Sequence, residues 1–155
     1  MSKSSVSEIC KNLDKEVESF RNPPLEGRCP FLTVDATYFK VRENNRVISK
    51  ALMIAYSTNE QGHHESLGFA AYRNESKDTC QDFLKSLKKR GLKGVLMIIS
   101  DAHEGIIHAI GAVFPTVHWQ RCQFHFSRNI ADKTPKKYQT GNYASIRLSP
   151  VMLPI

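Results

Sequence analysis

Residues 31–56, FLTVDATYFKVRENNRVISKALMIAY, decide the fold of this chain. Two segments rich in β-branched and aromatic residues, 31–41 and 47–56, lie on either side of the polar stretch Glu43-Asn44-Asn45-Arg46. Such segments favour strands, and a short link that contains asparagine favours a tight hairpin turn between them. A third segment of this kind, SLGFAAY at 66–72, follows a polar loop. The sequence therefore predicts three strands in an antiparallel meander.

Helical and strand patterns alternate after this meander. From Lys77 to Arg90 the apolar residues recur at the spacing of one helical face, and Gly91 is a natural stop for that helix. The segment GVLMII at 94–99 is apolar at every position, which is typical of a parallel strand covered on both faces. The pattern ends with an amphipathic helix before Pro115, a short strand at 116–119 and a helix at 122–131. We therefore predict an α/β fold with a mixed sheet.

The two ends of the chain differ from this central region. Residues 4–20 show a helical stripe of apolar residues, which Asn22-Pro23-Pro24 brings to a stop. After Thr134 the sequence has neither a helical stripe nor strand alternation. We therefore expect a terminal helix of a preceding region at 1–24, a catalytic or binding core at 25–134, and an unstructured tail at 135–155.

Composition narrows the class of protein. The chain has 155 residues, of which 41% are hydrophobic, and this favours a globular fold over a disordered one. No stretch reaches the roughly 18 apolar residues of a membrane helix, and no apolar run follows the first lysine, so we expect a cytoplasmic protein. The four cysteines form no CxxC pair and are expected to be reduced thiols.

The chain is basic, with a net charge of +7 and a pI near 9.3. A basic surface suits a polyanionic partner, and nucleic acid is the commonest one. The charge alone leaves open the alternative of a solvated basic surface without a partner. One of the densest basic runs surrounds Lys88, Lys89 and Arg90.

Two aspartates are candidate ligands for a cation. Asp35 lies inside the first predicted strand, on the same face as Thr33 and Thr37, where a carboxylate is costly unless it is paired or bound to a cation. A solvent-facing aspartate is the alternative there. Asp101 follows the buried strand, at the end where α/β sheets place ligands. Asp101 and Glu104 also fit a helix capping box, which would explain Asp101 without a ligand.

A third cluster is His118-Trp119-Gln120-Arg121-Cys122-Gln123-Phe124-His125. Cys122 and His125 are three residues apart and therefore share a helical face. Zinc bound by His118, Cys122 and His125 is a minority interpretation, because a structural zinc site needs about four ligands. A buried cysteine and a hydrogen-bonded histidine that pack the helix onto the sheet are the alternative.

These segments resemble the Mutator-type transposases of bacterial insertion sequences. The likeness covers roughly residues 5–140 and runs through VDATYFKVRENNRVISKALMIAYSTNEQGHHESLGF and FLKSLKKRGLKGVLMIISDAHEGIIHAIGAVFPTVHWQRCQFHFSRNI. An acid-bearing strand, a second acid ahead of an amphipathic helix and a C-x-x-H motif occur in the family's order. The resemblance implies an RNase H-like core, in which the first and fourth strands are neighbours.

The resemblance also implies a function. Asp35 and Asp101 match the first two acids of an Asp-Asp-Glu triad that binds two Mg²⁺ or Mn²⁺ ions, and Cys122 and His125 match the C-x-x-H motif. Such enzymes cut DNA at terminal inverted repeats and join the freed 3′ ends to target DNA, as oligomers. The residues that we expect to contact DNA are Lys88, Lys89, Arg90, Arg121 and Arg128.

The chain departs from the family at the third acid. The family's glutamate lies far downstream, whereas no glutamate follows Glu104 here, and the family-like sequence stops near Gln139-Thr140. We therefore expect a core that is incomplete at its C-terminus, a tail read in a shifted frame, and no catalysis by this chain alone. A non-catalytic fragment that binds DNA or intact subunits and regulates them is the second hypothesis.

Overall fold

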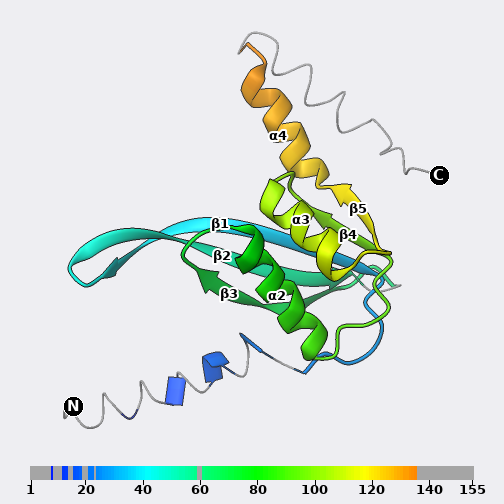
Figure 1. Ribbon diagram of the computed structural model, residues 1–155, viewed down its shortest axis with the longest axis horizontal. Helices are drawn as coiled ribbons and strands as arrows, with labels where there is room; N and C mark the ends of the chain where they lie inside the picture. The colour runs from blue at the N-terminus through cyan, green and yellow to red at the C-terminus, as the bar shows by residue number, and fades with distance from the viewer. Residues whose placement is uncertain are drawn as a thin grey trace.

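The computed structural model describes residues 8, 12–13, 16–18, 21–22, 24–58 and 61–135. The elements follow one another as β1 (Phe31–Glu43), β2 (Arg46–Thr58), β3 (His64–Tyr72), α2 (Lys77–Lys89), β4 (Met97–Ser100), α3 (Glu104–Val113), β5 (His118–Arg121) and α4 (Gln123–Lys133) (Figure 1). No helix in this described part of the chain is long and apolar enough to cross a membrane.

The predicted meander is confirmed, with β1 and β2 as its longest pair. They run antiparallel from Phe31↔Thr58 to Glu43↔Arg46, and β3 pairs with the second half of β2. Asn44 and Asn45 form the turn with φ values of 49° and 60°. Two consecutive left-handed residues match the twist of a hairpin, and asparagine tolerates this conformation better than most side chains. The turn that the polar residues between the two strands predict is therefore confirmed.

The sheet has the order β3-β2-β1-β4-β5. β4 lies parallel to β1, with the pairs Phe31↔Met97, Leu32↔Ile98 and Thr33↔Ile99, and β5 lies parallel to β4. Three antiparallel strands followed by parallel strands, with the first and fourth as neighbours, form the RNase H-like arrangement. The predicted α/β class and this arrangement of the sheet are confirmed.

The core lies between one face of the sheet and the helices α2 and α3, which pack against each other on that face (Figure 1). Strand alternation sends Leu32 and Val34 of β1 into this core. The apolar stripe of α2 meets them, and its fully buried members are Cys80, Phe83, Leu84 and Leu87. Ser76 caps α2 in a capping box with Thr79.

β4 differs from the prediction for residues 94–99. The strand begins only at Met97, because Leu96 and Met97 both donate their N–H groups to the Pro30 carbonyl where the chain enters the sheet. Leu96 is 56% exposed, and Met97 and Ile99 are only partly buried. The expectation of a strand covered on both faces is therefore wrong for the described residues. An apolar run does not by itself reveal which of its residues pair.

The chain ends lie mostly outside the described residues. In the predicted helix at 4–20, the residues described are helical, and Leu13 and Val17 of its stripe are exposed. Residues 136–155, nearly all of the expected tail, lie outside the described part. The domain boundaries predicted after residues 24 and 134 stay a prediction.

Candidate functional site

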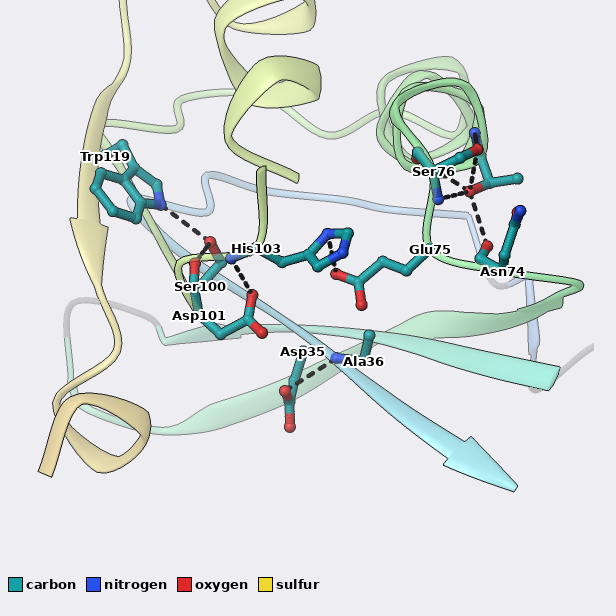
Figure 2. A network of polar contacts seen from close by, with 10 residues as sticks. Asp35, Ala36, Asn74, Glu75, Ser76, Ser100, Asp101, His103 and Trp119 are labelled. Carbon is teal, nitrogen blue, oxygen red and sulfur yellow. Dashed lines mark hydrogen bonds and ion pairs between the residues drawn. The ribbon is translucent and has the colours of Figure 1, made fainter. Parts of the chain in front are cut away.

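The two aspartates lie on neighbouring parallel strands. Asp35 is on β1, on the face opposite to Leu32 and Val34, and Asp101 directly follows β4. The β1–β4 register ends at Thr33↔Ile99, so Asp35 lies two residues further along β1 and Asp101 two residues past Ile99, just beyond the end of β4. Adjacent strands are about 4.8 Å apart. Figure 2 shows both carboxylates at this end of β4.

Asp35 has a partly exposed carboxylate with two neighbours. Its Oδ1 accepts the backbone N–H of Ala36 at 2.9 Å, and His125 Nε2 lies 3.8 Å from the same oxygen. The Asp35 side chain is 45% exposed. The described residues offer no hydrogen bond to Oδ2, so one carboxylate oxygen is available to a ligand.

Asp101 does not cap α3, and the predicted capping box is wrong. The N-cap residue is His103, which makes no side-chain capping bond, and α3 begins at Glu104. Asp101 Oδ1 instead accepts the backbone N–H of His103 at 3.2 Å, within the loop before the helix. The helix therefore begins two residues later than the capping interpretation assumed. The second carboxylate oxygen of Asp101 has no hydrogen-bond partner among the described residues.

Ser100 holds the backbone of Asp101 in place. Its side chain is buried, and its hydroxyl donates to the Asp101 carbonyl at 2.8 Å. The same hydroxyl accepts the indole N–H of Trp119 at 2.9 Å, which ties β5 to the end of β4 (Figure 2). The position of the second acid therefore depends on a buried polar chain that spans two strands.

Glu75 is a third carboxylate near this site, and the sequence analysis missed it. Its side chain is 6% exposed, and its Oε1 lies 3.3 Å from His103 Nδ1. Burial raises the pKa of Glu75, the neighbouring His103 opposes the rise, and the charges of Asp101 and Asp35 add to it. Glu75 belongs to the short link between β3 and α2, which has no periodic pattern. Its only sequence signal is its place directly before the helix cap Ser76.

The C-x-x-H motif lies against both acids. The N–H of Cys122 donates to the Ser100 carbonyl at 2.6 Å, which anchors α4 next to Asp101. His125, one turn into α4, faces Asp35, and its Nδ1 is buried without a hydrogen-bond partner. The motif thus connects α4 to the end of β4 through Ser100 and to the interior of β1 through Asp35.

The described residues do not form the zinc cluster considered above. No three Asp, Glu, His or Cys side chains among them come together as a metal site. His118 is the first residue of the four-residue strand β5 and Cys122 follows its last residue, so the two lie at opposite ends of an extended strand. The zinc interpretation is therefore wrong for this part of the chain.

The expected DNA-binding residues lie on two surfaces. Lys88 and Arg90 are at the far end of α2 from Glu75, about 20 Å along the helix, and both are engaged locally. Lys88 Nζ donates to the Val113 carbonyl at 3.1 Å, and the Arg90 guanidinium donates to the Leu67 carbonyl, with burial lowering the pKa of Arg90.

The other three expected DNA-binding residues, Lys89, Arg121 and Arg128, differ in whether their side chains already contact other residues. Lys89 is exposed beside Lys88. Arg121 lies over the Phe126 ring, 5.1 Å from its centroid, and Arg128 pairs with Asp132 at 4.0 Å on the exposed side of α4. That any of these five residues contacts DNA stays a prediction.

Asp35 and Asp101 fit a divalent cation in part. Mg²⁺ takes oxygen ligands, is commonly held by one or two carboxylates, and keeps several waters. Each aspartate offers one carboxylate oxygen that the described residues leave free, and each lies two residues beyond the last β1–β4 pair. Two carboxylates can hold one such ion. The nearby Glu75 is engaged by His103, and no three possible ligands among the described residues come together as a metal site.

Comparison with known proteins identifies a family. The family model for "Transposase, Mutator family" matches residues 1–148. The transposase for insertion sequence element IS256 in transposon Tn4001 of Staphylococcus aureus is 45% identical over 138 residues, which are 88% of this chain and 35% of that protein. The transposase for ISRM5 of Rhizobium meliloti is 43% identical over 137 residues, 88% of this chain and 34% of that protein.

Solved structures show a more distant likeness. The catalytic core domain of HTLV-2 integrase in complex with magnesium superposes with a TM-score of 0.41 at 13% identity, over 77% of this chain and 82% of that one. Such a low TM-score supports no conclusion about function. The sequence relatives are more informative, although the chain spans only about a third of their length. On the match over residues 1–148, the chain belongs to the Mutator family of transposases.

Proposed function

We propose that this chain is part of the DNA transposase of an insertion sequence, with Asp35 and Asp101 as its first two metal-binding acids. The parallel pairing of β1 with β4 supports the proposal, because Asp35 and Asp101 each lie two residues beyond its last pair, Thr33↔Ile99. The chain's family and its insertion-sequence transposase relatives support this assignment. The reaction that we propose for the complete protein is cutting at terminal inverted repeats followed by strand transfer into target DNA.

The chain's own residues orient the two acids. The N–H groups of Ala36 and His103 each hold one carboxylate oxygen, so that the other oxygen is directed to a ligand. When bound, Mg²⁺ or Mn²⁺ ions supply an activated water and stabilise the leaving 3′ oxygen. His125 Nε2 lies 3.8 Å from Asp35 Oδ1, which places α4 directly beside the first acid.

Metal binding is the direct test. Mn²⁺ added to the ¹⁵N-labelled chain should broaden the amide signals of residues around Asp35 and Asp101. Asp35→Asn and Asp101→Asn should each weaken this broadening by about tenfold, because each removes one of two charged ligands. Asp132→Asn is the matched control, since Asp132 is an exposed aspartate at the far end of α4. Broadening that is centred elsewhere, or that survives both variants, contradicts the assignment.

We do not expect catalysis by this chain alone. The sequence has no glutamate after Glu104, and two carboxylates do not hold the two ions that strand transfer needs. Incubation with Mg²⁺ or Mn²⁺ and terminal-repeat DNA should leave the DNA intact. Clear cleavage of that DNA, absent in Asp35→Asn, would refute this expectation.

DNA is the proposed partner, in the form of terminal inverted repeats and target DNA, and the net charge of +7 supports it. We further infer that the complete transposase is a homo-oligomer that works on the bacterial nucleoid.

A non-catalytic regulatory role is the second candidate. The net charge of +7 fits it, because a basic chain can occupy DNA without reacting. Co-expression with an intact relative distinguishes the two candidates, since a regulatory fragment lowers transposition and an inert one leaves it unchanged.

A further inference from the structure

The β1–β2 hairpin extends well beyond the rest of the sheet. β3 ends where Tyr72 pairs with Ala51, and β4 pairs only with residues 31–33 of β1. Residues 38–51, from Tyr38 through the Asn44–Asn45 turn to Ala51, therefore form a two-stranded ribbon that has no neighbouring strand beyond Ala51 at its base. We call these residues the arm. Figure 1 shows the arm projecting away from α2 and α3.

The arm starts at the candidate site. Asp35 lies on the same strand, three residues before Tyr38. At about 3.4 Å per residue, the strand runs roughly 27 Å from Asp35 to the turn. One base pair also adds about 3.4 Å along a DNA axis. A duplex held at Asp35 and Asp101 can therefore lie beside the arm over roughly eight base pairs.

The arm is basic and its charges are mostly uncompensated. It carries Lys40, Arg42, Arg46 and Lys50 against a single acid, Glu43. Glu43 pairs with Lys50 at 3.1 Å. Lys40, Arg42 and Arg46 are exposed, and none of them has an ion pair with another described residue. Three cations without a protein partner remain on one projecting ribbon.

These cations lie on both faces of the ribbon. Lys40 and Arg42 share one face with Tyr38, because alternate residues of a strand point to the same side. Arg46 is paired with Glu43 in the register and therefore lies on the opposite face. A flat partner would meet only one face. A groove with a phosphate backbone on each wall meets both.

Exposed apolar side chains accompany the charges. Tyr38 is 55% exposed, Phe39 37% and Val47 62%. Lysine and arginine alone could serve to keep a free strand edge from pairing with another chain. That role does not account for aromatic and aliphatic side chains left in water on the same ribbon. A partner that offers both phosphates and apolar surfaces does, and the base edges and sugars of DNA offer such surfaces.

We propose that the arm, residues 38–51, is a DNA-binding ribbon that enters a groove of the duplex next to the Asp35–Asp101 site. This inference rests on the proposed function, which makes DNA the partner. The major groove is about 12 Å wide and admits a two-stranded ribbon, whose strands are about 4.8 Å apart. Lys40, Arg42 and Arg46 contact phosphates on its two walls.

The test compares two sets of charge removals in the same chain. The arm variant carries Lys40→Gln, Arg42→Gln and Arg46→Gln. The control variant carries Lys85→Gln, Lys93→Gln and Lys133→Gln, which removes the same charge from exposed positions outside the arm. Circular dichroism should show the native fold in both, because none of the six side chains is part of the core.

Binding is measured by the fluorescence anisotropy of a labelled 30-base-pair duplex of random sequence at several NaCl concentrations. Each lost phosphate contact lowers the slope of log K against log salt by about 0.9, so the arm variant should lose roughly 2 to 3 from the slope and bind at least about tenfold more weakly near 0.1 M salt. The control variant should keep the slope of the native chain within about 0.5.

Three results overturn the proposal in distinguishable ways. If the native chain binds no duplex, the proposed DNA partner and the arm's role fail together. If the native chain binds and the arm variant binds with the same slope as the control, the arm alone is refuted. If the arm variant keeps its DNA affinity but loses self-association in sedimentation, the arm is a contact between subunits.

Discussion

Replacing Ser100 by alanine is expected to destabilise the fold by about 2 kcal/mol. The Ser100 hydroxyl is 1% exposed and makes two hydrogen bonds, to the Asp101 carbonyl and from the Trp119 indole. Each such bond contributes about 1 kcal/mol net, and the half-buried indole N–H left without its partner adds to the cost. For a domain of this size the loss corresponds to a fall of roughly 8 °C in Tm.

Urea denaturation followed by tryptophan fluorescence measures this loss, since Trp119 is the chain's single tryptophan. Ser66→Ala, at an exposed position of β3, is the control and should change stability by less than about 0.5 kcal/mol. A double-mutant cycle with Trp119→Phe, followed by circular dichroism, isolates the shared bond and should give a coupling of about 1 kcal/mol. Additive effects of the two substitutions, or a Ser100→Ala loss no larger than that of the control, would refute the role of this polar chain.

Three further outcomes follow from the same structure. Burial raises the pKa of Glu75, so its contribution to stability is present below the usual glutamate pKa and is lost as pH rises through the higher folded value. Glu75→Gln should therefore gain stability relative to the native chain between pH 4 and pH 7, as urea titrations will show. Burial, together with the charges of Glu75 and Asp101, raises the pKa of Cys80 to about 12. Iodoacetamide at pH 8 should therefore leave Cys80 unmodified in the native chain and modify it in urea, which mass spectrometry of the peptides will show. Gly91→Ala should lower the stability by more than about 1 kcal/mol in thermal unfolding, because Gly91 has a φ of 111° and a Cβ there would lie 2.4 Å from the Leu25 carbonyl oxygen. The control Gly111→Ala, which has open space around the added Cβ, should not lower it by this amount.

The local patterns of the sequence predicted most elements of this fold. The hairpin was predictable because residues 43–46 combine turn-forming side chains with strand-forming neighbours. The helix α2 was predictable because Cys80, Phe83 and Leu84 repeat at helical spacing and meet the sheet. The start of β4 was not, because hydrogen bonds to the Pro30 carbonyl, rather than apolar character, decide where that strand begins.

The sequence pointed to a site residue only where a chemically reactive side chain stands at an unusual place in a local pattern. Asp35 could be singled out because a carboxylate among strand residues is unusual, and its role as a ligand stays a prediction. The capping interpretation of Asp101 failed because the path of the loop places His103, rather than Asp101, at the helix start. Glu75 was missed because its burial results from packing between β3, α2 and the loop before α3, and no local pattern encodes such packing.

The short parallel pairing of β1 with β4 has a consequence for how the molecule assembles. The hairpin closes between neighbouring residues and can form within microseconds, whereas residues 31 and 97 are far apart in the chain, with β2, β3 and α2 between them. Because the β1–β4 ladder has only three residue pairs, we expect this pairing to form late in folding and to open early. Fraying of β4 would separate the two acids while the meander persists, and the amide protons of β4 should exchange with solvent earlier than those in the middle of β2.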